Sequence, residues 1–256
     1  MQTTAPQIDQ SRNMEERSWW DLWNTSYRAE DNRDVTSNQL FAHVAALVRK
    51  MIPRQPGRIL EVACGTGTLS RQLNFSSYHG LDISPAAIEI ARSKTPGICG
   101  ERAIVQTYEA ADFHVWLSPP DPFDLVLCVD AISCFRDQQL VLRRMAGMVC
   151  TGGLCIVTTI NPVVYNRIRR VGGVKLENGP VSHWLSRREL HDLFCQAGLS
   201  IEHSYTIMPR GNMGCLRIVN SARLNEAFGP RCAAMFRRVK EWVGLGQYRV
   251  VIARKG

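Results

Sequence analysis

The chain has 256 residues, of which 45% are hydrophobic and 21% are charged, and its formal net charge is +8 at pH 7. This composition is typical of a soluble globular protein of one domain, or one and a half, and excludes a disordered or fibrous chain. No stretch reaches the roughly 18–20 consecutive apolar residues that a transmembrane helix needs. Residues 1–9 are polar and lack the basic and apolar segments of a secretory signal.

The cysteines and the distribution of charges indicate the compartment, the absence of a metal site and the kind of partner. The nine cysteines form no CxxC pair and no zinc-type spacing, so the sequence predicts reduced thiols, no metal and a cytoplasmic protein. Residues 1–161 hold 15 basic and 17 acidic side chains (net −2), whereas residues 162–256 hold 16 and 6 (net +10). The basic C-terminal part indicates either an anionic partner or a solvated face that only aids solubility.

Residues 12–35 are rich in Trp and Arg, and the apolar spacing over residues 36–51 predicts a helix. From there to residue 160, short apolar runs alternate with helical patterns, which predicts a parallel sheet covered by helices on both faces. The predicted strands are 58–63, 78–83, 101–106, 124–129 and 153–160, and the predicted helices begin at Thr68 and at Ser84-Pro85 and cover 138–149.

The pattern changes after the fifth strand. Residues 162–185 are basic and irregular, and Ser186 and Glu189 form a capping box for a helix that ends at Gly198. Two further strands are predicted at 199–207 and 248–253. We therefore divide the single domain into an N-terminal helical cap (1–52), a core (53–207), a helical insertion (208–245) and the last strand (246–256).

The strongest motif is a glycine-rich turn after the first strand, Glu61-Val-Ala63-Cys64-Gly65-Thr66-Gly67. Gly65 and Gly67 lack β-carbons, so a ligand can approach the backbone closely. A dinucleotide fingerprint would need glycine at positions 63 and 68, where the chain has Ala63 and Thr68, and no Gly-Lys-Ser/Thr of a phosphate loop follows. The turn therefore predicts neither of these two phosphate-binding sites.

Two carboxylates indicate the class of ligand. Glu61 ends the first strand, and Asp82 ends the second strand 21 residues later (82 − 61). A carboxylate in the turn repels a pyrophosphate but suits a cationic amino group, and Asp82 is placed to bind ribose hydroxyls. A ribose and a cation without phosphate fit S-adenosylmethionine. The alternative is that both carboxylates only cap turns.

The series Glu61-x-x-Cys64-Gly65-Thr66-Gly67, Asp82, Ala111-Asp112-Phe113 and Gly152-Gly153 resembles the motifs of class I S-adenosylmethionine-dependent methyltransferases of the small-molecule type. The resemblance covers residues 36–207 and the last strand. It implies an α/β fold with a doubly wound, mostly parallel seven-stranded sheet of the Rossmann-like type. N-terminal helices precede this sheet, and a helical insertion precedes its last strand.

The resemblance also implies which residues hold the cofactor. The backbone from Ala63 to Gly67 holds the methionine part, and Asp82, next to Ile83, holds the ribose. The adenine lies against the segment from Ala111 to Phe113, and Val129 lines the site after the fourth strand. Ala63 departs from the family, which usually has glycine there. The implied cofactor-binding residues are Tyr27, Glu61, Ala63, Cys64, Gly65, Thr66, Gly67, Asp82, Ile83, Ala111, Asp112, Phe113 and Val129.

The run Trp19-Trp20-Asp21-Leu22 is similar to the N-terminal helix of ubiquinone-pathway O-methyltransferases. In the wider family an aromatic residue of this helix closes over the methionine end of the cofactor, and this resemblance assigns that role to Tyr27. A plain amphipathic packing helix is the alternative.

Methyl transfer from a sulfonium is an in-line displacement, in which alignment and exclusion of water supply much of the acceleration. A general base is needed only when the acceptor is a neutral group such as a hydroxyl. His183, in the irregular segment before a helix, is the candidate catalytic base, and the alternative is a surface or packing histidine.

We predict O-methylation of a small metabolite, with N- or C-methylation, RNA methylation and a non-methylating member of the fold as alternatives. A nucleic-acid partner is not expected, because the chain has no appended RNA-binding module and no Asn/Asp-Pro-Pro-Tyr motif after the fourth strand. The insertion 208–245 carries an apolar stripe flanked by Arg and Lys. It is a lid over the site, a basic amphipathic element that contacts an anionic membrane surface, or a packing or dimer contact.

Overall fold

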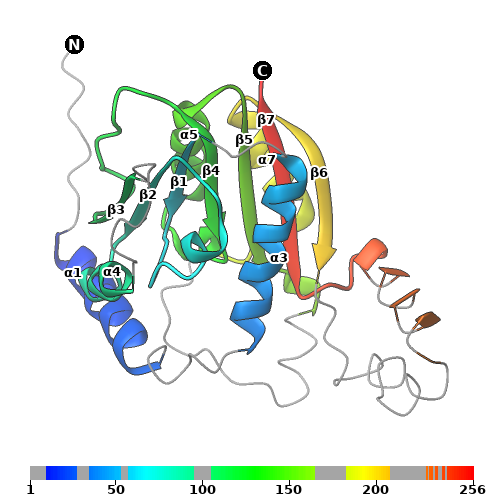
Figure 1. Cartoon of the computed structure of the whole chain (residues 1–256), viewed down its shortest axis with the longest axis horizontal. Coiled ribbons are helices and arrows are strands. Elements are labelled where there is room, and N and C mark those ends of the chain that lie inside the picture. The colour runs from blue at the N-terminus through cyan, green and yellow to red at the C-terminus, as the bar shows by residue number, and fades with distance from the viewer. Residues whose placement is uncertain are drawn as a thin grey trace.

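The structure is a computed structural model that describes residues 10–27, 35–52, 57–94, 105–164, 183–207, 229, 231–232, 234–235, 238–239 and 241–256, without the side chains of 10–13, 26–27 and 35–38. In this part of the chain, seven strands form one sheet in the order β3-β2-β1-β4-β5-β7-β6 (Figure 1). The strands are β1 (Arg58–Val62), β2 (Ser77–Asp82), β3 (Val105–Ala110), β4 (Phe123–Val129), β5 (Val149–Ile160), β6 (Leu199–Ile207) and β7 (Tyr248–Lys255).

The order of the strands predicts a crevice at their carboxyl ends. β1 pairs in parallel with β2 and β4, β2 with β3, and β4 with β5, whereas β7 is antiparallel to β5 and β6. The chain moves outward from β1 to β3 and then returns to place β4 on the other side of β1. Ligands of open α/β sheets bind at such a reversal, outside the carboxyl ends of the strands.

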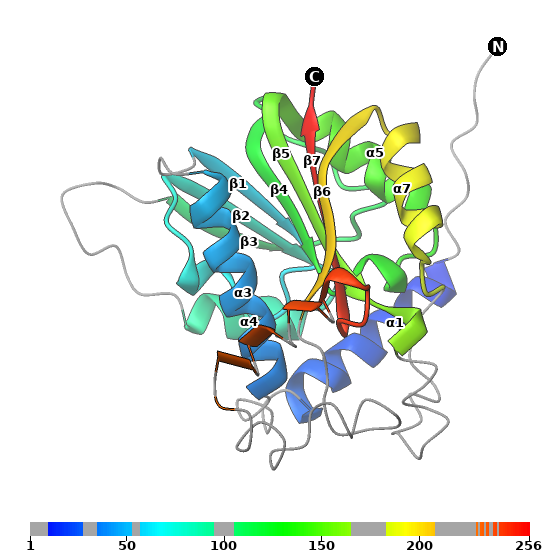
Figure 2. The ribbon, with the colours of Figure 1, turned by 90° about the vertical axis from the view of Figure 1, so that its right-hand side faces the viewer.

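Helices cover both faces of the sheet (Figure 2). Val44 and Ile88 pack with Ile59 on one face, and Met145 and Phe194 belong to the separate apolar core on the other face. Central strands such as β4 are therefore buried on both sides, which explains their continuous apolar sequences. The covering helices are α3 (Val35–Met51) and α4 (Pro85–Ser93) on the first face, and α5 (Gln138–Met148) and α7 (Arg187–Gln196) on the second.

The predicted helix starts at Ser84 and Ser186 are confirmed. The Ser84 side chain accepts from the Ala87 N–H, and Pro85 occupies the first helical position of α4. Ser186 and Glu189 form the reciprocal capping box at the start of α7. The doubly wound, mostly parallel seven-stranded fold is confirmed as well.

Three predicted element boundaries are wrong. The turn after Gly67 continues into a short 3₁₀ helix, η3 (Ser70–Gln72), and not into a helix from Thr68, because the backbone is left-handed at Gly67 (φ +67°) and already extended again at Leu73. β3 starts at Val105 within the described residues and continues to Ala110, in register with β2 up to Asp82, rather than ending at residue 106. β5 starts at Val149, before the predicted Gly153, and its pairing with β4 is irregular there.

Two N-terminal elements lie across the carboxyl edge of the sheet, α1 (Gln10–Leu22) and the π-helical turn η1 (Trp23–Tyr27) (Figures 1 and 2). Both contact α4. Within the predicted N-terminal cap (1–52), α1 and η1 therefore lie beside the crevice, whereas α3 covers a face of the sheet.

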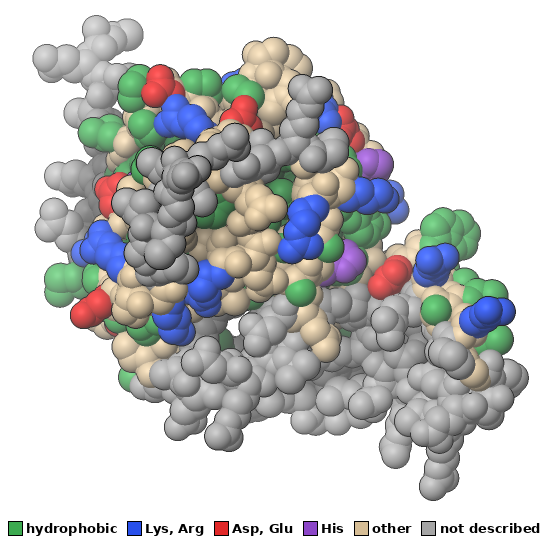
Figure 3. Space-filling model, viewed as in Figure 1, with side chains coloured by type: hydrophobic (Ala, Val, Ile, Leu, Met, Phe, Trp, Pro, Cys, Tyr) green, Lys and Arg blue, Asp and Glu red, His purple; other side chains and the backbone are tan. Residues whose placement is uncertain are grey.

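Of the insertion, residue 229 and residues 231–232, 234–235, 238–239 and 241–245 are described, mostly as helix. In this segment the apolar Met235, Val239 and Trp242 are exposed, and so are the basic Arg231 and Arg238 (Figure 3). The C-terminal end of the segment is fixed to the sheet, because Thr206 Oγ1 donates to the Glu241 carbonyl (2.8 Å). The rest of the insertion lies outside the described residues.

Candidate active site

A pocket lies at the carboxyl ends of β1, β2 and β4, beside α1. Eight of the predicted cofactor-binding residues line it: Ala63, Gly65, Asp82, Ile83, Ala111, Asp112, Phe113 and Val129. Glu61, Cys64, Thr66, Gly67 and His183 are not among the lining residues, and the side chain of Tyr27 lies outside the description. The other lining residues are Glu16, Trp20, Trp23, Asn24, Leu81, His114, Asp130, Ala131, Cys134, Phe135 and Arg136.

The turn after β1 is fixed by Asp82. The Gly65 N–H donates to Asp82 Oδ2 (2.7 Å), and the Ser84 N–H donates to Asp82 Oδ1 (3.0 Å). Ala63 and Gly65 both have positive φ values, +59° and +53°. The two amides hold the Asp82 carboxylate in one orientation at the pocket wall.

Gly67 is required by packing against the core. A β-carbon at this position would lie 2.6 Å from the hydroxyl oxygen of Tyr108, and φ is +67°. That hydroxyl lies 2.7 Å from Ser70 Oγ in a buried contact. The sequence assigned Gly67 to the ligand, and the structure supplies a second reason for the glycine at this position.

Glu61 lies beneath the turn rather than at the pocket surface. It is 1% exposed, and the Tyr78 hydroxyl donates a hydrogen bond to its Oε2. Burial and then the Glu61 charge raise the pKa of Tyr78 well above its usual value, so this phenol remains a donor. The predicted contact of Glu61 with a cationic amino group stays a prediction.

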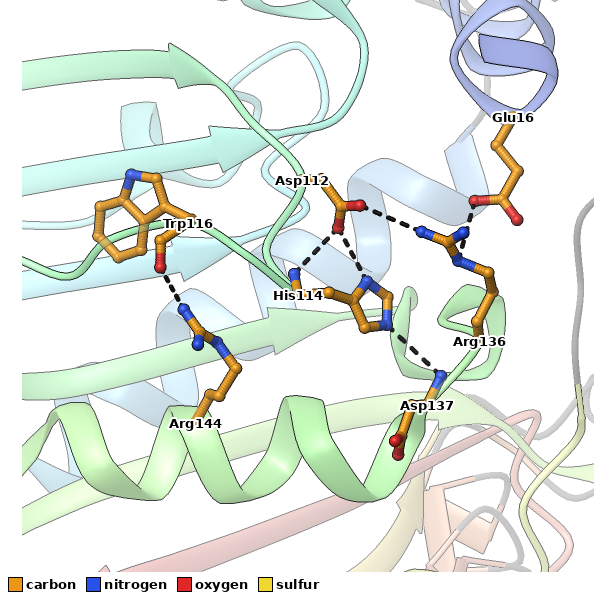
Figure 4. Close-up of polar contacts among 7 residues, drawn as sticks. All are labelled: Glu16, Asp112, His114, Trp116, Arg136, Asp137 and Arg144. Carbon is orange, nitrogen blue, oxygen red and sulfur yellow. Dashed lines mark hydrogen bonds and ion pairs between the residues drawn. The ribbon is translucent and has the colours of Figure 1, made fainter. Parts of the chain in front are cut away.

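Asp112 is the centre of a polar network next to the Asp82 segment, since the Ala111 N–H donates to the Asp82 carbonyl (2.8 Å) (Figure 4). The His114 backbone N–H and Nδ1 lie 2.9 and 2.8 Å from Asp112 Oδ1, and Arg136 Nη2 lies 3.1 Å from Oδ2. The Asp137 N–H donates to His114 Nε2 (3.4 Å), which leaves Nδ1 to donate to Asp112. Burial alone would raise the pKa of Asp112, but the His114 hydrogen bonds and the Arg136 charge outweigh it and lower that pKa.

The N-terminal helix supplies the third wall. Asp21 Oδ1 accepts from the Ala86 N–H (3.2 Å) and from the Ser84 hydroxyl, so α1 is attached to the start of α4. Arg136 Nε lies 3.6 Å from Glu16 Oε2, which joins α1 to the Asp112 network. Trp20, Trp23 and Asn24 complete this wall.

Sequence reasoning missed the N-terminal lining residues, although a signal was present. Residue 20 follows residue 16 by four, and residues 23 and 24 follow residue 20 by three and four, so a helix places them on one face. The contact between that face and a pocket formed about 40 to 120 residues later is not visible in the local sequence pattern.

The end of β4 forms the floor beside Val129. Asp130 has a φ of +59°, and its N–H donates to the carbonyl and the Oγ1 of Thr158 (both 3.0 Å). Burial first, and then the charges of Asp130 and Asp82, raise the pKa of Cys134 to about 12. Cys134 is therefore a neutral thiol that lines the pocket and not a nucleophilic thiolate.

His183 lies next to the pocket through its backbone, with its imidazole directed elsewhere. Its N–H donates to the Ser133 carbonyl (3.3 Å), whereas Nε2 lies 2.9 Å from Glu189 Oε1 in the capping box of α7. The side chain is 57% exposed. The assignment of His183 as the base stays a prediction.

The described residues also bear on metals and membranes. No three His, Cys, Asp or Glu side chains among them are grouped so that they could hold a metal ion. In the same part of the chain, none of the helices is both long and apolar enough to span a bilayer. Residues 229–244 do not line the pocket where they are described, and the three alternatives for the insertion stay open.

Three comparisons relate the chain to known proteins. It is 23% identical over 176 residues to a malonyl-[acyl-carrier protein] O-methyltransferase of Halorhodospira halophila, covering 63% of this chain and 58% of that one. It is 29% identical over 157 residues to a ubiquinone biosynthesis O-methyltransferase of Azorhizobium caulinodans, covering 60% and 57%. The chain thus spans less than three fifths of the length of these two curated relatives.

The fold is similar to that of the magnesium protoporphyrin IX methyltransferase of Synechocystis PCC 6803 with bound S-adenosylhomocysteine. The TM-score is 0.62 at 14% identity, over 95% of this chain and 99% of that one. A family model described as a methyltransferase domain matches residues 35–204. The chain therefore belongs to the methyltransferase domain family, which confirms the family and the enzyme class that its motifs predict.

Proposed function

We propose that this chain transfers a methyl group from S-adenosylmethionine to a hydroxyl oxygen of a small metabolite in the cytoplasm. The observation that carries the proposal is the Asp82 carboxylate, which two backbone amides hold at the wall of a pocket at the carboxyl edge of the sheet. The names of the two curated relatives both end in O-methyltransferase, which supports oxygen as the acceptor atom.

The lining residues fit the parts of the cofactor. Asp82 would bind the ribose hydroxyls, and Asp112 with Phe113 would bind the adenine. The positive φ values at Ala63 and Gly65 shape the backbone that would hold the methionine part. The bound cofactor supplies a methyl group on a positively charged sulfur.

This chain contributes binding, orientation and exclusion of water. Trp20, Trp23, Phe113 and Phe135 give the pocket large apolar surfaces, and an apolar, closed site favours a reaction in which the sulfonium charge disappears. The acceptor oxygen forms a bond to the methyl carbon as the carbon–sulfur bond breaks, and the hydroxyl proton leaves to a base. His183 is our candidate for this base, since its N–H donates to the carbonyl of Ser133, which immediately precedes the pocket residue Cys134.

Calorimetry with S-adenosylhomocysteine tests the cofactor site. We expect Asp82→Ala to weaken binding by about 1–3 kcal/mol, because a hydrogen-bonding carboxylate is lost. Asp121→Ala is the matched control, since Asp121 is exposed and lies away from the pocket. Equal affinity of a folded Asp82→Ala variant and the control would show that Asp82 does not bind the ribose.

The acceptor is identified by incubating the protein and methyl-labelled S-adenosylmethionine with metabolite extracts and analysing the labelled product. Label on oxygen supports the proposal, and label on nitrogen, on carbon or only on RNA contradicts its acceptor. Once a substrate is known, His183→Gln should lower kcat without changing S-adenosylhomocysteine affinity. An unchanged kcat would remove His183 as the base.

A further inference from the structure

Arg249 on β7 is a buried cation without an anionic partner among the described residues. Its side chain is 7% exposed and, among the described residues, makes one hydrogen bond, a long one from Nη2 to Asn161 Oδ1 (3.4 Å). Its Nε is buried and has no hydrogen-bond partner in the same part of the chain. Within the described part of the chain, no carboxylate lies at ion-pair distance from this guanidinium. A buried charge without compensation is costly, so its presence requires an explanation.

The surroundings of Arg249 are polar and positive. In the sheet register it lies between Thr159 of β5 and Thr206 of β6, on the face covered by α7. The other charge that acts on it is also a cation: after burial, the charge of Arg187 is the second cause that lowers the pKa of Arg249. The same two arginines also lower the pKa of His191 on α7, after burial, whereas the charge of Asp192 raises it.

This positive cluster lies next to the proposed active site. Thr159 Oγ1 is 2.8 Å from Ser133 Oγ, and Ser133 immediately precedes the pocket residue Cys134. β7 is separated from β4, whose last residue Val129 lines the pocket, by β5 alone. Two strand spacings of about 4.8 Å put Arg249 roughly 10 Å from β4, which is the span of a small molecule.

We propose that Arg249, assisted by Arg187, binds an oxyanion of the methyl acceptor, either a carboxylate or a phosphate. This inference rests on the proposed function, because it names the acceptor class of that same site. A guanidinium matches the geometry of both groups through paired N–H donors. An anion held at β7 would direct the remainder of the acceptor across β5 toward the pocket, and such a remote contact supplies orientation for the transfer.

Thermal unfolding with small anions tests the site without turnover. The probes are inorganic phosphate and benzoate, each compared with sodium chloride at the same ionic strength. We expect at least one probe to raise the Tm of the wild type by about 2–4 °C at a few times its Kd. In Arg249→Met this response should be lost, and without probe the variant should melt at or above the wild-type temperature because the uncompensated charge is gone.

Arg254→Met is the matched control. Arg254 is on the same strand but is ion-paired with Glu202 near the surface, so this variant should keep the anion response. Arg187→Gln changes an exposed position and should fold; we expect it to weaken the response at least twofold. This second variant keeps the test valid if Arg249→Met does not fold.

Two results would overturn the inference: no response to either probe in the wild type, or an equal response in Arg249→Met (or in Arg187→Gln, where only that variant folds). Calorimetry with S-adenosylhomocysteine on the same samples separates the two proposals. If the wild type responds to an anion but does not bind S-adenosylhomocysteine, the proposed function is contradicted. If the wild type binds S-adenosylhomocysteine but does not respond to an anion, only the oxyanion site is contradicted.

Discussion

Ala63 holds a left-handed backbone conformation, with φ at +59°, at the wall of the pocket. For an L-residue other than glycine this conformation costs about 1–2 kcal/mol. Glycine would remove that cost but would give the unfolded chain about 0.5–1 kcal/mol more freedom. We therefore expect Ala63→Gly to leave the free energy of unfolding unchanged or to raise it by up to about 1.5 kcal/mol, as measured by urea denaturation.

The control for this prediction is an alanine in ordinary helical conformation. Ala87 is fully buried in α4, and Ala87→Gly should lower the free energy of unfolding by at least about 1 kcal/mol, since glycine is a poor helix former. If both variants lost the same stability, the backbone at Ala63 would not be strained.

The lowered pKa of Asp112 predicts that the free energy of unfolding falls at acidic pH. Its pKa is lowered in the folded state, so its contribution is complete above the usual aspartate pKa of 3.8 and is lost as the pH falls through the lowered value. At pH 7, Asp112→Asn should cost about 1–3 kcal/mol through weaker bonds to His114 and Arg136. The difference between the two proteins should shrink in urea titrations below pH 3.8, and a constant difference would contradict this.

At the scale of elements, α1 reaches the pocket because Asp21 accepts hydrogen bonds at the start of α4. Asp21→Ala removes these bonds and should weaken S-adenosylhomocysteine binding about 2- to 30-fold, which corresponds to the 0.5–2 kcal/mol of a lost cap. Hydrogen exchange in α1 should increase in the same variant. Asp21→Asn keeps an acceptor at this place and should lie near the wild type, and equal effects of both variants would exclude the capping role.

Local chemistry explains which elements were predictable. The helix starts at Ser84 and Ser186 follow from side chains that bond to amides three residues away, so a short window of sequence contains the whole interaction. In place of the helix predicted from Thr68 the chain forms η3, where Ser70 Oγ donates to the Gly67 carbonyl and also contacts the hydroxyl of Tyr108, which is 38 residues away. The second contact involves tertiary structure and leaves no local signal.

At the scale of the whole molecule, the site was predictable where the parallel topology dictates it. The carboxyl ends of neighbouring parallel strands lie together, which predicts that the turn after β1 and Asp82 share one site; Val129 was assigned by the family resemblance, and all three segments line the pocket. The ion pair between Glu16 and Arg136 and the environment of Arg249 depend on how separate layers pack, and that packing is not encoded in any one segment. The excess of basic residues after residue 161 was visible in the sequence, and the structure shows that one of them is buried.

Ligand binding at the carboxyl ends of the strands should raise the free energy of unfolding of the whole molecule, but it should slow hydrogen exchange more in some segments than in others. S-adenosylhomocysteine at 100 times its Kd contributes about 2.7 kcal/mol, which should raise the Tm by roughly 5–11 °C for a chain of this length. Hydrogen exchange should slow in α1 and in the turns after β1, β2, β3 and β4, because these segments line the pocket. Residues 150–153, at the start of β5, lie outside the pocket lining and serve as the internal control. Equal slowing of exchange in the pocket-lining segments and in residues 150–153 would indicate only global stabilisation. Slowing confined to segments that do not line the pocket would place the ligand elsewhere.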